Sequence, residues 1–188
     1  MSAVVLAAVA RAVPRPPILL CCGAALAGVA TISQLAGHRG ALVALQASTI
    51  ALAGATVTLL AEPPAALDAV PTTLARRRAL LLSAAVLPLA LLWIALLTIG
   101  GADGGEAFAL SLQLAAVTAL SLGLAARGGD PGRALAGVAL AFGAGRILFG
   151  PQLFPAGTEA ANWSGATGWW AGAACAGLAL LAASSRDR

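Results

Sequence analysis

Six apolar runs, each about as long as a membrane-spanning helix, fill most of the chain, and nearly all of its charges fall between them or at their ends. A helix that crosses the hydrocarbon core of a bilayer needs roughly 20 predominantly apolar residues. The runs lie at 17–37, 41–61, 79–99, 106–126, 133–149 and 166–184. The sequence therefore predicts an all-α, polytopic membrane protein, built as a bundle of six transmembrane helices in one domain.

The scarcity of charge supports this class over a soluble one. Only 10% of the 188 residues are charged, whereas a soluble domain carries about 25%. So few charges cannot cover a water-exposed surface, and six spans leave no room for a separate catalytic domain. The net charge of +4 would suggest a nucleic-acid partner in a soluble protein. Here the charges lie at span ends, so membrane lipid is the predicted partner and nucleic acid is not.

The arginines predict how the bundle is oriented, because positively charged segments stay on the cytoplasmic side of a membrane. With six spans, only Arg39 and Arg146 fall on the outer side. The other nine fall on the inner side: Arg11, Arg15, Arg76, Arg77, Arg78, Arg127, Arg133, Arg186 and Arg188. We expect both termini in the cytoplasm, a cytoplasmic loop at 62–78 and an outer loop at 150–165. Abundant Ala and Gly and the lack of lysine indicate a high-GC bacterium, and hence its inner membrane.

The N-terminal segment 1–13 is too short to span and ends at a proline cluster. Its apolar residues with Arg11 suit a short helix lying at the cytoplasmic interface, and a frayed terminus suits them equally. Arginines before an apolar run also begin signal peptides, but we expect an uncleaved first span. The cysteines Cys21, Cys22 and Cys175 all fall inside apolar runs, so no disulfide framework is expected.

Small and polar residues inside the spans predict how the helices associate. Since lipid is as apolar as leucine, transmembrane helices are held together by close packing and by interhelical hydrogen bonds. We expect seams at the small residues Gly23, Ala24, Gly28, Gly137, Gly143, Gly168 and Gly172. Polar residues such as Ser48, Thr49 and Ser111 suit structural hydrogen bonds. If Gln34, Gln46 and Gln113 point to one side, they would line part of a substrate path.

Arg146 is the most informative single residue, because it lies about 20 Å along the fifth span at about 1.5 Å per residue. An unpaired charge at that depth is costly. The side chain must therefore extend to the interface or meet an acid, for which Glu159, Glu106 and Asp103 are the candidates. Two roles stay open at this point, a structural ion pair and contact with a substrate on the translocation path.

Several kinds of chemistry are excluded. A P-loop needs a lysine at the phosphates, and the chain has none. His38 is the only histidine, and no His, Cys and acid cluster has metal-ligand spacing. All seven acids lie at span ends or in loops, which argues against a proton-driven carrier. We expect a non-catalytic chain with no metal and no cofactor of its own.

The layout combines an interfacial N-terminal helix, six spans with both ends inside, a long cytoplasmic stretch after the second span, and a Gly/Pro-rich segment between the last two. It resembles the compact six-span permease of ATP-binding-cassette exporters, a class that includes bacterial drug, polysaccharide and antibiotic-resistance exporters. The stretch Glu62–Arg78 also resembles small permease-like proteins of actinobacteria. The resemblance covers the whole chain as a layout.

This resemblance implies how the chain would work. A short coupling helix would dock on a separate ATPase subunit, and its residues would be Ala65, Ala66, Leu67, Asp68, Ala69 and Val70. ATP and Mg would be held by that partner. A second membrane subunit, identical or different, would complete the path of a small or amphipathic molecule across the membrane.

Two other classes remain open. The chain suits a non-catalytic accessory subunit that stabilises a larger membrane complex, since its loops are short and its spans lack acids at mid-depth. A membrane enzyme acting on lipid fits less well, because the acid and base residues for such chemistry are missing.

Overall fold

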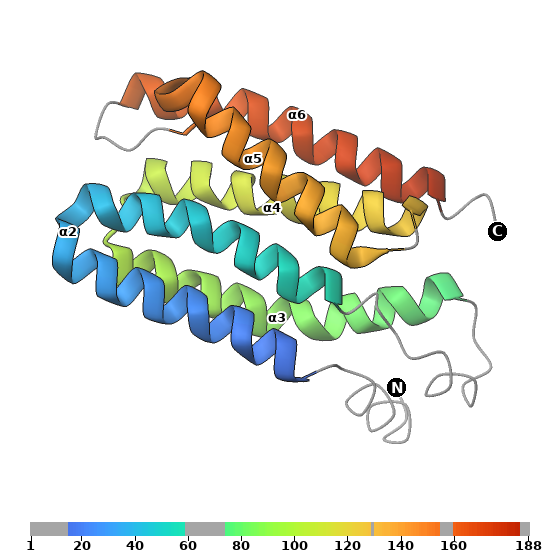
Figure 1. Cartoon of the computed structure of the whole chain (residues 1–188). Coiled ribbons are helices and arrows are strands. Elements are labelled where there is room, and N and C mark those ends of the chain that lie inside the picture. The colour runs from blue at the N-terminus through green and yellow to red at the C-terminus, as the bar shows by residue number, and fades with distance from the viewer. Residues whose placement is uncertain (1–14, 59–73, 129, 155–159, 185–188) are drawn as a thin grey trace.

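The computed structural model is a bundle of long helices (Figure 1) and describes residues 15–58, 74–128, 130–154 and 160–184. These residues form five helices and no strand. The helices are α2 (Arg15–Thr58), α3 (Leu74–Gly100), α4 (Gly104–Gly128), α5 (Pro131–Leu153) and α6 (Ala160–Ser184). The predicted all-α class is confirmed for this part of the chain.

Helix α2 is bent into a hairpin. Its backbone leaves helical angles at Gly37, where φ is 63° and ψ is −162°, a conformation that glycine adopts without a Cβ clash. The two arms run antiparallel on either side of this bend (Figure 1). Each arm contains about 21 residues and is therefore about 32 Å long at about 1.5 Å per residue.

The two arms of α2 and the helices α3 to α6 alternate in direction through the bundle (Figure 1). The start of α2 and the end of α6 consequently lie at the same end, on the right in Figure 1. That end also holds Arg127 in the last turn of α4 and Arg133 in the first turn of α5, and we call it the arginine-rich end. The opposite end holds the bend of α2 and the short connection between α3 and α4.

Three helical stretches of the described residues are long and apolar enough to cross a membrane: Pro16–Thr58, Gly104–Arg127 and Ala166–Ser184. A shorter apolar helix covers Val86–Gly100. Large apolar side chains on the outside of the bundle agree with a lipid-facing surface, since Leu35 is 82% exposed and Ile147 is 85% exposed. These features support a membrane protein, while the number of six spans stays a prediction.

Some expected boundaries differ from the observed ones. Helix α3 already begins at Leu74, within the loop expected at 62–78, because the sequence Leu-Ala-Arg-Arg-Arg consists of strong helix formers. Helix α5 resumes after a bend at Gly150 and ends at Leu153, and α6 begins at Ala160, so the connection expected at 150–165 is shorter. The expected N-terminal helix at 1–13 and most of the loop at 62–78 lie outside the described residues.

Helix α4 lies at the centre and packs on α2, α5 and α6. It contributes Leu110, Val117 and Leu122 to three separate buried apolar clusters. The first cluster joins it to α2 and α3, and the second joins it to α2, α5 and α6. Helix α4 therefore connects α2, α5 and α6, whereas α3 packs mainly on α2.

The expected glycine seams are wrong for most of the positions chosen. A Cβ atom added at any of these glycines would meet no neighbour within 4 Å: Gly23, Gly28, Gly137, Gly143, Gly168 and Gly172. The tight approach is instead between α4 and α6. A Cβ at Gly177 would lie 2.5 Å from the backbone of Ala119 and Leu120, and one at Gly123 would lie 2.8 Å from the carbonyl oxygen of Gly177. The sequence shows which residues are small but not which helix face meets a neighbour.

We expect Gly177→Ala to destabilise the bundle, because the added methyl group would push the α4 backbone away. Overpacking of this kind typically costs about 1–3 kcal/mol. The matched control is Gly168→Ala on the same helix, which adds the methyl group in open space and should change the free energy of unfolding by less than about 0.5 kcal/mol. Unfolding in mixed micelles, followed by tryptophan fluorescence, measures both. Equal losses in the two variants would contradict the close α4–α6 contact.

Candidate functional site

Two groups of polar residues in the described part of the chain link different helices and include a charged side chain. One consists of Gln46, Thr49, Gln113 and Arg146, which we call the polar cluster. The other consists of His38, Asp103 and Glu106, which we call the capping cluster. Both combine residues far apart in the sequence: the polar cluster is largely buried, whereas in the capping cluster only Glu106 is buried.

The polar cluster joins α2, α4 and α5 by side-chain hydrogen bonds. Arg146 Nη1 donates to Gln46 Oε1. Thr49 Oγ1 donates to the main-chain oxygen of Gln46 at 2.7 Å, and Gln113 Nε2 donates to Thr49 Oγ1 at 3.5 Å. Gln46, Thr49 and Gln113 are at most 2% exposed. These buried polar groups therefore supply one another, together with Arg146, with hydrogen-bond partners.

The cluster lies near the middle of the bundle. Gln46 lies nine residues after Gly37, and Gln113 lies nine residues after Gly104. Each is therefore about 14 Å along its helix from the opposite end of the bundle. In an arm about 32 Å long, this is close to half its length.

Arg146 has neutral neighbours in the described residues. Besides the Gln46 amide, its guanidinium carbon lies 5.9 Å from the ring centroid of Phe154, a cation–π distance. Phe154 packs edge to face on Phe142 and on Trp170, with ring centroids 4.6 and 5.4 Å apart. Within the described residues the ion pairs are His38–Glu106 and Arg133–Asp130, and neither includes Arg146. The half-buried charge thus meets an amide and an aromatic face.

Of the three acids expected to pair with Arg146, two are bound elsewhere. Glu106 and Asp103 belong to the capping cluster, and Glu159 lies outside the described residues.

The other predicted site residues divide between the core and the surface. Gln46 and Gln113 come together in the polar cluster, whereas Gln34 is exposed on the first arm of α2. The expected coupling segment Ala65–Val70 lies outside the described residues. Sequence reasoning gave Thr49 only a structural role, although its spacing of three residues from Gln46 places both side chains on one helix face. That spacing was the available signal for the cluster.

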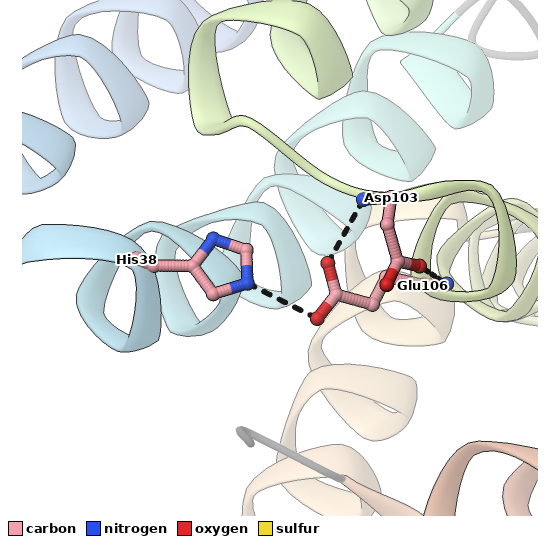
Figure 2. Close-up of polar contacts among 3 residues, drawn as sticks. All are labelled: His38, Asp103 and Glu106. Carbon is pink, nitrogen blue, oxygen red and sulfur yellow. Dashed lines mark hydrogen bonds and ion pairs between the residues drawn. The ribbon is translucent and has the colours of Figure 1, made fainter. Parts of the chain in front are cut away.

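The capping cluster closes the opposite end of the bundle (Figure 2). Glu106 N donates to Asp103 Oδ1 at 2.8 Å, and Asp103 N donates to Glu106 Oε2 at 3.0 Å. This reciprocal pair is a capping box at the start of α4. The other Glu106 oxygen lies 3.1 Å from His38 Nε2, next to the bend of α2. Glu106 is 2% exposed, so the buried carboxylate joins the α2 bend to the first turn of α4.

Sequence reasoning missed this contact, although the pairing of Asp103 with Glu106 could have been predicted from their spacing. The spacing Asp103-x-x-Glu106 is a capping-box pattern, but nothing in the sequence places His38, 68 residues earlier, beside it. The two ends of the contact are brought together only by the hairpin shape of α2.

The described residues contain no group of three His, Cys, Asp or Glu side chains that could hold a metal ion. Comparison of the chain with protein-family models, with curated proteins and with solved structures gave no match. Functional inference therefore rests on the chain's own residues, above all on the polar cluster.

We expect Glu106→Ala to lower the free energy of unfolding by about 1–3 kcal/mol, because it leaves the Asp103 amide and His38 without their acceptor. A double-mutant cycle with His38→Ala should give a coupling energy of at least about 0.5 kcal/mol. Asp130→Ala removes the exposed N-cap of α5 at the other end and should cost about 1 kcal/mol with no coupling to His38. Additive losses of unfolding free energy for the His38 and Glu106 variants would contradict a stabilising contact between these two side chains.

Proposed function

We propose that the chain is the membrane-embedded permease subunit of an ATP-driven exporter, and that it moves a small or amphipathic molecule across the inner membrane with a separate ATPase subunit. The polar cluster is the observation that supports this proposal. Structural hydrogen bonds between spans need only amides and hydroxyls, which Gln113 and Thr49 already supply. A formal charge at mid-depth is expensive in a membrane, and such charges usually mark substrate or ion pathways.

Six crossings are part of the proposal. The two arms of α2 and the helices α3 to α6 contain about 21–27 residues each, more than the roughly 20 that a bilayer requires. The arginines of the arginine-rich end would face the cytoplasm. Both termini would then be cytoplasmic, and the capping cluster would lie at the outer surface.

The energy source would be a partner, because a chain without lysine has no P-loop of its own. The segment Ala65–Val70 lies in the sequence between α2 and α3 and would contact the ATPase subunit, which would hold ATP and Mg. Closure of the ATPase would tilt the second arm of α2 and α3 as rigid bodies. A second membrane subunit, identical or different, would complete the path.

A second candidate function is that of an accessory subunit in a larger membrane complex. One surface favours it. Gly168, Gly172 and Ala176 line a shallow groove on the outer face of α6, together with Trp169 and Ala173. Small residues at four-residue spacing let a neighbouring helix approach closely. A copurifying membrane complex without an ATPase would favour this function.

The proposed orientation predicts the accessibility of two exposed arginine positions at opposite ends. In a chain whose three cysteines are replaced by serine, Arg39→Cys should react with a membrane-impermeant maleimide in intact cells. Arg127→Cys should react only after permeabilisation. Reversed labelling would contradict the orientation, and labelling of both positions from one side would contradict the crossings between them.

The exporter proposal predicts that an ATPase subunit copurifies in mild detergent and that amphipathic molecules stimulate its ATP hydrolysis. Replacement of Ala65–Val70 by a Gly/Ser segment of equal length should reduce that stimulation at least tenfold, because the contact with the ATPase is removed. The control Arg133→Gln changes a charge that is 90% exposed and should leave stimulation unchanged. Copurification without any ATPase would refute the exporter proposal.

A further inference from the structure

The guanidinium of Arg146 has more binding capacity than its described neighbours use. Arginine carries five N–H donors in a planar fork. In the described structure it donates to one amide oxygen and lies near one aromatic ring, and neither neighbour carries a negative charge. Charges inside membrane helices normally pair with an opposite charge. The geometry therefore leaves this cation suited to an anion from outside the described residues.

The surroundings favour an anion. The acids of the described residues are bound elsewhere: Asp103 and Glu106 in the capping cluster, and Asp130 in an exposed pair with Arg133. The other members of the polar cluster are two amides and a hydroxyl, so the cluster holds no negative charge that would repel an anion at Arg146. A planar guanidinium binds carboxylate or phosphate oxygens through two parallel hydrogen bonds.

The outer face of α5 suits an apolar body attached to that anion. Leu140, Ile147 and Leu148 are 75%, 85% and 73% exposed, and a Cβ added at Gly143 would meet no neighbour within 4 Å. Arg146 is itself only half-buried. A ligand could therefore place its charged group at Arg146 and leave its apolar chain along α5, in contact with lipid.

We infer that Arg146 binds the anionic group of an amphiphile, a carboxylate, phosphate or sulfate joined to an apolar chain, which reaches the polar cluster from the lipid-facing side of α5. The inference names the substrate class of the permease, and in that respect it rests on the proposed function. The binding itself requires neither ATP nor a partner subunit.

The experiment uses the full chain in dodecyl maltoside, with dodecyl phosphate as the probe. Dodecyl phosphate should raise the midpoint of thermal unfolding by several degrees, because a ligand that binds only the folded state stabilises it. Native mass spectrometry should show one bound molecule. Inorganic phosphate should produce a much smaller shift of the unfolding midpoint. An equal shift would show that the site binds a free anion and would overturn the inference that its ligand is an amphiphile.

Three variants locate the site. Arg146→Gln should weaken the apparent affinity for dodecyl phosphate at least tenfold, and Arg146→Lys, which keeps the charge, should weaken it less. Arg133→Gln, on the same helix but 90% exposed, should bind as the parent does. Unchanged binding by a folded Arg146→Gln, or an equal loss in Arg133→Gln, would overturn the inference.

The acid Glu159 provides a further test. If Glu159 neutralises Arg146, Glu159→Gln should destabilise the chain as much as Arg146→Gln does. Dodecyl phosphate should then leave the unfolding midpoint of the parent unchanged. These two results together would overturn the inference. Binding that depends on Arg146 in a chain that copurifies with no ATPase would leave the anion site standing and refute only the exporter proposal. ATP-driven export of an uncharged molecule, with no dodecyl phosphate binding, would support the exporter proposal and overturn the anion site at Arg146.

Discussion

In the hydrocarbon layer of a membrane, a polar group must find its partner inside the protein, and this constraint explains most of the described structure. Helices satisfy their own backbone groups. The hydroxyls of Ser48 and Thr56 bond back to carbonyl oxygens four residues earlier, at 2.8 Å in each case. The Trp93 indole instead crosses from α3 to α4 and donates to Ser111 at 2.9 Å. Polar side chains that reach a neighbouring helix therefore help to hold α2, α3, α4 and α5 together.

Helix α4 is held by three different contacts along its length. At its start, Glu106 connects it to the bend of α2. Near its middle, Gln113 joins the polar cluster, and towards its end Gly123 lies against the backbone of α6 at Gly177. The first two contacts are polar and the third is steric, as expected where lipid competes with apolar side chains but not with hydrogen bonds or close packing.

The sequence predicts the features that depend on local pattern, such as helices and their breaks. It does not predict which side chains of different helices come into contact. The break at Gly37 and the long apolar helices follow from composition and from glycine, and they appear in the structure. The glycine seam was misplaced because alanine and glycine are so common here that spacing does not distinguish a packed face from a lipid-facing one. The contact of His38 with Glu106 joins two helix ends, and only the finished fold brings them together.

The unequal packing of the helices bears on how the polar cluster could work. The α4–α6 pair is the most extensive contact in the described bundle and includes backbone against backbone, whereas α5 packs less on α4 and still less on α2 and α6. Arg146 therefore lies on a helix held less firmly than the Gln113 side of the cluster. A displacement of α5 relative to α2 would separate Arg146 from Gln46. The Arg146 side chain on α5 donates to the Gln46 amide on α2, and α5 and α2 pack on each other only sparsely. Ligand binding and movement of α5 relative to α2 are therefore linked, because an anion at Arg146 would compete with Gln46 for the guanidinium.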